Sequence, residues 1–195
     1  QQREWLLAGV SDPQPRWTLL ASQIGMSRIA VGNSRRPWGV ANTDSWDGYA
    51  HERAALLHAL NAAQRRRFVV FSGDMHATLA GVLQPGELAP DLPDADAVFG
   101  AEFMTPAVSS AATVDLLFPR LRQSGFLRQI TARTLGKLFG WMNPQLKYIN
   151  IDEHGYSIAE ISGNQVRWQA KMVEIDVPAA VASLRVAADF VYSPD

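Results

Sequence analysis

The 195 residues are 47% hydrophobic and carry a formal net charge of −1, which is typical of an ordinary soluble globular domain. This balance gives no support to a nucleic-acid or membrane-surface role, because either would leave a basic excess on one face, and we expect a small-molecule partner. Cysteine is absent, which excludes disulfides and thiolate ligands, so any metal must rely on Asp, Glu, His, Asn or backbone oxygen.

The termini and the apolar runs give further limits. No apolar run approaches the roughly 20 residues of a membrane span, and no basic-then-apolar signal segment opens the chain. The first residues, "QQREWLLAGV", read as the middle of an amphipathic helix with no capping residue before it. We therefore expect the chain to be a piece of a longer protein.

Helical and strand patterns alternate along the first half of the chain. We expect a helix at 2–8, a mostly buried strand at 17–25, a loop at 26–48, a helix at 49–63 and a buried strand that begins at Phe68.

The second half begins with a loop at 84–96 and a strand at 101–108. Helix is predicted between 113 and 139, with breaks near Pro119 and Gly125. Leu127, Ile130, Leu135 and Leu138 form one face of its second half. Three short strands follow at 146–151, 156–161 and 166–173, the last two joined by the turn "SGNQ", and the pattern at 184–192 fits strand or helix. This order predicts an α/β protein whose site lies at the ends of strands.

The stretch "FVVFSGDMHATLAGVL" places Asp74 and His76 directly after a buried strand. An Asp-x-His pair that leaves a strand supplies two oxygen or nitrogen ligands on a rigid base, as a metal site requires. In the structural alternative, Asp74 caps a helix that starts near Ala77 and His76 is a half-buried imidazole. The spacing alone leaves both interpretations open.

The order of the segments "DGYAHERAALLHAL", "FVVFSGDMHATLAGVL", "GAEFMTPAVSS" and "NPQLKYINIDEHGYSIAEI" resembles the C-terminal half of the alkaline phosphatase D family. These are PhoD-like metallophosphatases of the calcineurin-like phosphoesterase superfamily. "QREWLL" and "RWTLLASQIGM" match as well, whereas 34–42 and 113–141 match least. The resemblance implies a partial α/β/β/α metallophosphatase sandwich with a C-terminal antiparallel meander, and it makes 1–195 the C-terminal portion of the catalytic domain.

The resemblance also implies roles for three residues. Asp74 is the expected metal ligand, and His76 is the expected catalytic residue, as a metal ligand or a phosphate-facing group. Asp47, in "DSWDGY", is expected to be catalytic, with an Asx turn made by Asp-Gly as the alternative.

Weaker candidates lie in "NIDEHGY". His154 stands before a Gly-Tyr pair that the family often shows. Asn150 and Asp152 occupy alternating positions of a strand, which would point both to one face. A phosphate or metal contact by these residues competes with an ordinary loop tip between strands.

The activity implied by the resemblance is metal-dependent hydrolysis of phosphoesters, either small monoesters or diesters, the latter including polymeric substrates. Iron and calcium are implied for the binuclear or larger metal centre, with zinc or manganese as alternatives. Most ligands would lie in an N-terminal half that this sequence lacks, so we expect the fragment alone to be inactive. A periplasmic or secreted location is implied, and a non-catalytic structural or interaction module is the competing hypothesis.

Two structural expectations follow. Asp47, Asp74 and His76 should converge on one cavity, provided that the strands at Trp17 and Phe68 are parallel neighbours joined by the helix at 49–63. An apolar surface should remain where the absent half would pack.

Overall fold

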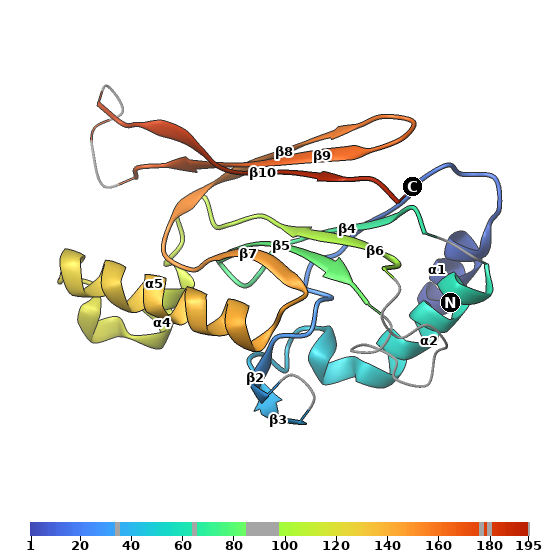
Figure 1. The fold of residues 1–195 in the computed structure, drawn as a ribbon, viewed down its shortest axis with the longest axis horizontal. Coiled ribbons are helices and arrows are strands. Elements are labelled where there is room, and N and C mark those ends of the chain that lie inside the picture. The colour runs from blue at the N-terminus through green and yellow to red at the C-terminus, as the bar shows by residue number, and fades with distance from the viewer. Residues whose placement is uncertain (34–35, 64–65, 85–97, 176–177, 179–180, 195) are drawn as a thin grey trace.

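Two stacked β-sheets and a layer of helices make up the fold (Figure 1). The computed structural model describes residues 1–33, 36–63, 66–84, 98–175, 178 and 181–194. The elements are α1 (Gln2–Ser11), β1 (Thr18–Ala21), β2 (Ala30–Asn33), β3 (Arg36–Val40), η1 (Trp46–Tyr49), α2 (Ala50–Ala62), β4 (Phe68–Ser72), β5 (Thr78–Leu83), β6 (Gly100–Met104), α4 (Thr113–Leu117), η2 (Pro119–Leu121), α5 (Gly125–Met142), β7 (Leu146–Asn150), β8 (His154–Ile161), β9 (Val166–Val173) and β10 (Leu184–Tyr192).

The central sheet has the strand order β1-β4-β6-β5-β7. Strands β1, β4 and β6 are parallel, whereas β5 runs antiparallel to both β6 and β7. The sheet is covered on one face by helices and on the other by the second sheet, as Figure 1 shows. Strands buried on both faces are typically continuous apolar runs, which is why "FVVFS" and "GAEFM" form its centre.

The predicted parallel pairing of the strands at Trp17 and Phe68 is confirmed. Thr18 pairs with Phe68, and α2 makes the connection between the two strands. On α2, Leu56, Leu57 and Leu60 pack on the sheet beside Phe68. The carboxyl ends of β1, β4 and β6 therefore share one edge of the sheet, the place where an α/β protein carries its site.

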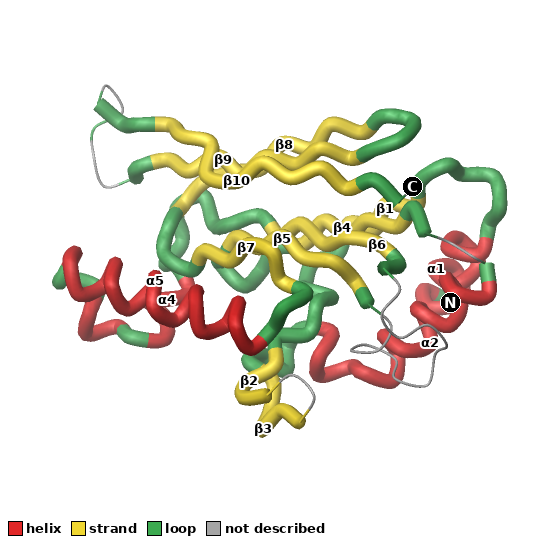
Figure 2. Tube along the Cα trace, viewed as in Figure 1, coloured by secondary structure: helices red, strands yellow, loops and turns green. Residues whose placement is uncertain are grey.

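The second sheet, of order β10-β9-β8, is antiparallel and stacks on the first (Figure 2). Every second residue of β9 is buried, so its inner face meets the central sheet. Trp168 stacks on Phe103 of β6 with ring centroids 5.0 Å apart. The open assignment at 184–192 is thus settled as a strand, and the predicted α/β class with a C-terminal antiparallel sheet is confirmed.

Two local expectations were wrong, and one structural alternative is excluded. The predicted loop at 26–48 contains the β2–β3 hairpin and the short helix η1. Strand β7 pairs with β5 of the central sheet, so it does not join β8 and β9 in one meander. After the Asp-x-His pair the chain enters β5, which excludes the alternative in which Asp74 caps a helix near Ala77.

The helical region 113–142 breaks as predicted, with η2 starting at Pro119 and α5 at Gly125. The predicted loop at 84–96 lies, after Gln84, outside the described residues. Within the part of the chain that the structure describes, none of the helices combines the length and apolar character that crossing a membrane requires.

A bidentate ion pair joins α4 to α5. Arg128 donates from Nε to Asp115 Oδ1 at 2.6 Å and from Nη2 to Oδ2 at 2.9 Å. The hydrogen bonds from Arg128 lower the pKa of Asp115 below its ordinary 3.8, although burial opposes the shift. Charge-assisted hydrogen bonds of this kind contribute about 2 to 3 kcal/mol when partly buried.

The pair predicts an acid-dependent stability. A carboxyl group whose pKa is lower in the folded than in the unfolded state stabilises the fold above the unfolded pKa. That contribution is lost as the pH falls through the folded pKa, here below 3.8. We expect Asp115→Asn to lower the melting temperature at pH 7, and the difference from wild type to shrink as the pH approaches 3. A difference that stays constant from pH 7 to pH 3 would exclude the ion pair as its source.

Candidate functional site

A strained turn at the carboxyl end of β4 carries the predicted Asp-x-His pair. Asp74 has φ 71° and His76 has φ 53°, and they are the residues other than glycine with positive φ in the described part of the chain. Such a conformation costs about 1 to 3 kcal/mol per residue and persists where the surrounding structure enforces it. The turn is thus a candidate functional site on backbone geometry alone.

The residues around the start of α4 enforce this conformation. Thr113 donates from its backbone nitrogen to the carbonyl of His76 at 3.2 Å, and from Oγ1 to the carbonyl of Met75 at 2.5 Å. Ala77 is buried beside Ala112 in one apolar cluster. The turn is therefore held from β4 on one side and from the start of α4 on the other.

The imidazole of His76 is oriented by the same segment. Its Nδ1 lies 2.6 Å from the carbonyl oxygen of Ala111. A carbonyl oxygen can only accept, so Nδ1 carries the hydrogen, and a neutral ring then keeps its lone pair on Nε2. Histidines that bind metals are typically oriented in this way by a backbone carbonyl. Asp74 is exposed, and its carboxylate makes no hydrogen bond or ion pair with the described residues.

His154 lies against the same segment. Its Nε2 is 2.8 Å from the carbonyl oxygen of Ser110, the residue before the one that orients His76. The backbone nitrogen of Gly155 donates to Ala107 at 3.1 Å. Two imidazoles from distant parts of the sequence thus contact consecutive carbonyls of the loop that follows β6.

Asn150 and Asp152 do not share this arrangement. Asn150 Oδ1 accepts from the backbone nitrogens of Asp152 and Glu153, both at 3.1 Å, so its side chain stabilises its own turn. Strand β7 ends at Asn150, and the expected strand alternation therefore does not reach Asp152. Asn150 and Asp152 nevertheless both line a groove of about 340 Å³ between α5 and β7, together with Arg133 and Lys137, and burial raises the pKa of the Asp152 carboxyl group.

Asp47 is buried and paired. Its Oδ1 accepts from Arg53 Nη1 at 2.7 Å, its Oδ2 accepts from the backbone nitrogen of Ile29 at 3.0 Å, and its side chain is 2% exposed. The Asx-turn alternative does not apply, because the turn is capped by Ser45, whose Oγ accepts from the nitrogen of Asp47. These contacts make Asp47 a support for the loop after β1, and its catalytic role stays a prediction.

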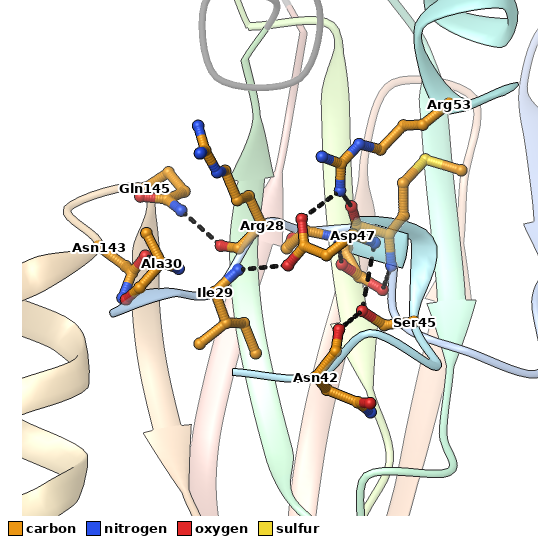
Figure 3. Close-up of polar contacts among 12 residues, drawn as sticks. Arg28, Ile29, Ala30, Asn42, Ser45, Asp47, Arg53, Asn143 and Gln145 are labelled. Carbon is orange, nitrogen blue, oxygen red and sulfur yellow. Dashed lines mark hydrogen bonds and ion pairs between the residues drawn. The ribbon is translucent and has the colours of Figure 1, made fainter. Parts of the chain in front are cut away.

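Side chains that the sequence did not single out hold the rest of that loop (Figure 3). Buried Glu102 accepts from the backbone nitrogens of Met26 at 2.8 Å and Ser27 at 2.5 Å, and from Ser72 Oγ at 2.6 Å. Ser72 is the last residue of β4, directly before the Gly73-Asp74 turn. One carboxylate therefore ties the loop after β1 to the strand that carries the candidate site.

The same loop is fixed further along by the segment after α5. Gln145 donates to the carbonyl of Arg28 at 2.8 Å, and Asn143 both donates to and accepts from the backbone of Ala30. Figure 3 shows the side chain of Arg28 extending away from these contacts. No hydrogen bond or ion pair of its guanidinium forms within the described part of the chain.

A cavity lies beside β1, the edge strand of the described central sheet. Its volume is about 610 Å³, and its lining includes Trp5, Leu6, Leu20, Trp46 and Tyr49. A second cavity, of about 250 Å³, flanks the same strand and includes Trp17 and Leu19. Neither cavity includes Asp74 or His76, so the expected convergence on one cavity with Asp47 stays a prediction.

Comparisons with known proteins point to one family. The family described as PhoD-like phosphatase matches residues 1–172. The chain is similar to alkaline phosphatase D of Bacillus subtilis (strain 168), with 28% identity over 199 residues that cover 100% of this chain and 30% of the relative.

A solved structure entitled "Structure of PhoD" has a similar fold, with a TM-score of 0.76 at 24% identity, covering 100% of this chain and 33% of the other. The chain therefore spans about a third of the length of these relatives. Since the family match extends over most of its residues, the chain belongs to the PhoD-like phosphatase family.

Proposed function

We propose that this chain supplies the C-terminal part of the active site of a metal-dependent phosphoesterase of the alkaline phosphatase D type. The observation that carries the proposal is the left-handed turn that presents Asp74 and His76 at the carboxyl edge of the central sheet. Family membership supports the reaction class, and the turn supports Asp74 and His76 as the residues involved.

The donor set at the turn fits part of a metal site. Asp74 has a carboxylate without a partner among the described residues, and Nε2 of His76 has no hydrogen-bond partner among them either. No group of three or more His, Cys, Asp or Glu side chains that could hold a metal occurs in the described part of the chain. Two donors are too few for a closed site, so in this proposal the remaining ligands come from elsewhere in the full-length protein.

The chemistry divides between the metal and the chain. Bound ions would lower the pKa of a water molecule and offset the negative charge of the phosphoryl oxygens. Iron and calcium are the proposed ions, with zinc or manganese as alternatives. His76 would present Nε2 to the metal or to the leaving oxygen of the ester, and the Ala111 carbonyl would keep the ring in that orientation.

The absent part of the domain is proposed to pack at β1. This strand is at the edge of the described central sheet, and the two cavities beside it, which share Trp5, Leu6 and Leu20, are lined largely by apolar side chains. An exposed strand edge beside apolar grooves is a typical site for adding another strand. The length of the relatives leaves ample chain for this role, and it is consistent with an N-terminal half that holds the other ligands.

Substrate and location are finer parts of the proposal. Small or polymeric phosphoesters are the proposed substrates, and monoester and diester hydrolysis would share the same metal chemistry. A secreted or periplasmic location is proposed from family membership alone. The competing function is a structural or interaction module, which would keep the fold and lack turnover.

The test compares the 195-residue chain with the full-length protein. We expect the full-length protein to hydrolyse para-nitrophenyl phosphate or its bis-ester, to lose this activity in a chelator, and to regain it when metal is added back. The 195-residue chain alone should show no turnover above background with any of the four metals. Robust turnover by the chain alone would refute the proposal that essential metal ligands lie outside this chain. An inactive full-length protein would favour the non-catalytic module.

A further inference from the structure

Helix α5 has two apolar faces, and the structure covers one of them. Ala132 and Gly136 are buried toward β7 of the central sheet, and Met142 is buried against Gly32 of β2. The apolar face that the sequence predicted is mostly the uncovered one, because Leu127, Ile130 and Leu138 are exposed. Phe126 and Trp141 are exposed as well, at 75% and 79%. A helix that is apolar on both sides normally meets a second apolar environment.

The segment before α5 carries further exposed apolar side chains. Leu116, Leu117 and Phe118 at the end of α4 are also exposed, and the Asp115–Arg128 pair fixes α4 against α5. We call the eight side chains the α4–α5 face: Leu116, Leu117, Phe118, Phe126, Leu127, Ile130, Leu138 and Trp141. Helices α4 and α5 lie at the end of the molecule opposite to α1 (Figure 1).

Positive charge gathers on the same segment. Residues 113–142 contain five cationic side chains and one acid, which gives a net charge of +4 in a chain of −1. The remaining residues therefore carry −5, which hides the asymmetry in the overall composition. The one acid, Asp115, is already paired with Arg128.

The cations lie where they can accompany the apolar side chains. At 3.6 residues per turn, Arg133 and Lys137 fall within about 20° of Phe126 around α5. Arg120 and Arg122 are exposed beside the end of α4. None of these four side chains forms an ion pair with the described residues.

We propose that the α4–α5 face binds the surface of an anionic lipid bilayer. A bilayer accepts both features together, because large apolar side chains enter the acyl boundary while Arg and Lys remain at the anionic headgroups. An apolar segment of the absent chain would cover the apolar side chains and make no use of the exposed cations, of which Arg133 lies close enough to Asp152 to offset part of the rise that burial causes in the pKa of that carboxyl group. A nucleic acid would pair with the cations and leave eight large apolar side chains in water.

The test is co-sedimentation of the 195-residue chain with lipid vesicles. We expect at least roughly tenfold stronger binding to vesicles of equal parts phosphatidylcholine and phosphatidylglycerol than to phosphatidylcholine alone. Raising the salt from about 0.05 to about 0.5 M should weaken that binding at least about fivefold, since headgroup attraction is screened.

Two double variants separate the charged and apolar contributions. Arg133→Glu with Lys137→Glu, and Phe126→Ser with Trp141→Ser, should each reduce binding at least about tenfold. The matched controls are Arg3→Glu with Arg16→Glu, at the other end of the molecule, and Trp38→Ser, which removes a Trp that is 88% exposed outside the face. Both controls should bind as wild type does, and thermal unfolding should show that every variant is folded.

Several results would overturn the proposal. One is no binding to the anionic vesicles at low salt, and another is an equal loss in the controls. A third is saturable binding to duplex DNA or RNA oligonucleotides that the charge variant abolishes while vesicles do not bind. Dimerisation through the face without lipid binding would identify a second copy as its occupant. Lipid binding by the 195-residue chain that the full-length protein lacks would show that the absent residues cover the face.

Discussion

Replacing His76 by alanine in the full-length protein is expected to lower kcat for a model phosphoester by about two to three orders of magnitude. The physical reason is the position of Nε2, which is left free when Nδ1 donates to the Ala111 carbonyl. A group that acts on the metal or the leaving oxygen contributes chiefly in the transition state, so kcat should fall more than KM changes.

Three controls make this result specific. His51→Ala removes an exposed imidazole from α2 and should leave kcat within about twofold, since surface substitutions are usually small in effect. His76→Gln keeps a polar side chain and should remain as inactive as the alanine variant. Thermal unfolding must show that the His76 variants are folded. A folded His76→Ala protein with kcat within about threefold of wild type would remove His76 from the reaction.

The second large effect is expected on stability, at the buried Arg53–Asp47 pair. Arg53→Met should lower the free energy of unfolding by about 3 to 5 kcal/mol, because it leaves a buried carboxylate without its cation. The pair is almost fully enclosed, with side-chain exposures of 4% for Arg53 and 2% for Asp47. Urea unfolding of the 195-residue chain measures the change.

A double variant tests the reason for this loss. Arg53→Met with Asp47→Asn removes the buried charge and keeps an oxygen that accepts from the backbone nitrogen of Ile29. It should recover about half of the stability lost in the single variant. Arg16→Met, at an exposed site, is the control and should be close to neutral. If the single and double variants are equally unstable, the uncompensated charge is not the cause.

The elements that the sequence predicted well are those whose signal is local. "FVVFS" and "GAEFM" are short, largely apolar segments typical of a covered strand, and Pro119 and Gly125 mark real breaks in the helical region. The β8–β9 turn is equally local, since Ser162 and Gln165 bond to each other across four residues.

The errors concern choices that depend on distant partners. Strand β7 could pair with β8 or with β5, and its own sequence does not indicate which of the two it pairs with. Helix α5 offers two apolar faces, and only the position of the sheet decides which one is buried. A short hairpin such as β2–β3 contains Gly and Pro, which are also the usual residues of loops.

The candidate site likewise combines residues with a local sequence signal and contacts between residues far apart in the sequence. Asp74 and His76 could be singled out because they follow a buried strand within a few residues. The contacts that hold the site span much longer separations: Glu102 reaches Met26 across 76 positions, and Asn143 reaches Ala30 across 113. One signal was present in the sequence, since Glu102 is a carboxylate inside an otherwise apolar strand, where an acid is rare unless it is bonded.

We propose that Asp74 and His76 contribute metal ligands to a phosphoesterase active site. The most direct test of this proposal is anomalous X-ray scattering from crystals of the full-length protein grown or soaked with Mn²⁺. We predict an anomalous peak about 2.0 to 2.3 Å from His76 Nε2 or from a carboxylate oxygen of Asp74, the distance typical of such ligands. A well-occupied metal centre elsewhere in the protein, with both residues more than about 6 Å from any ion, would contradict it.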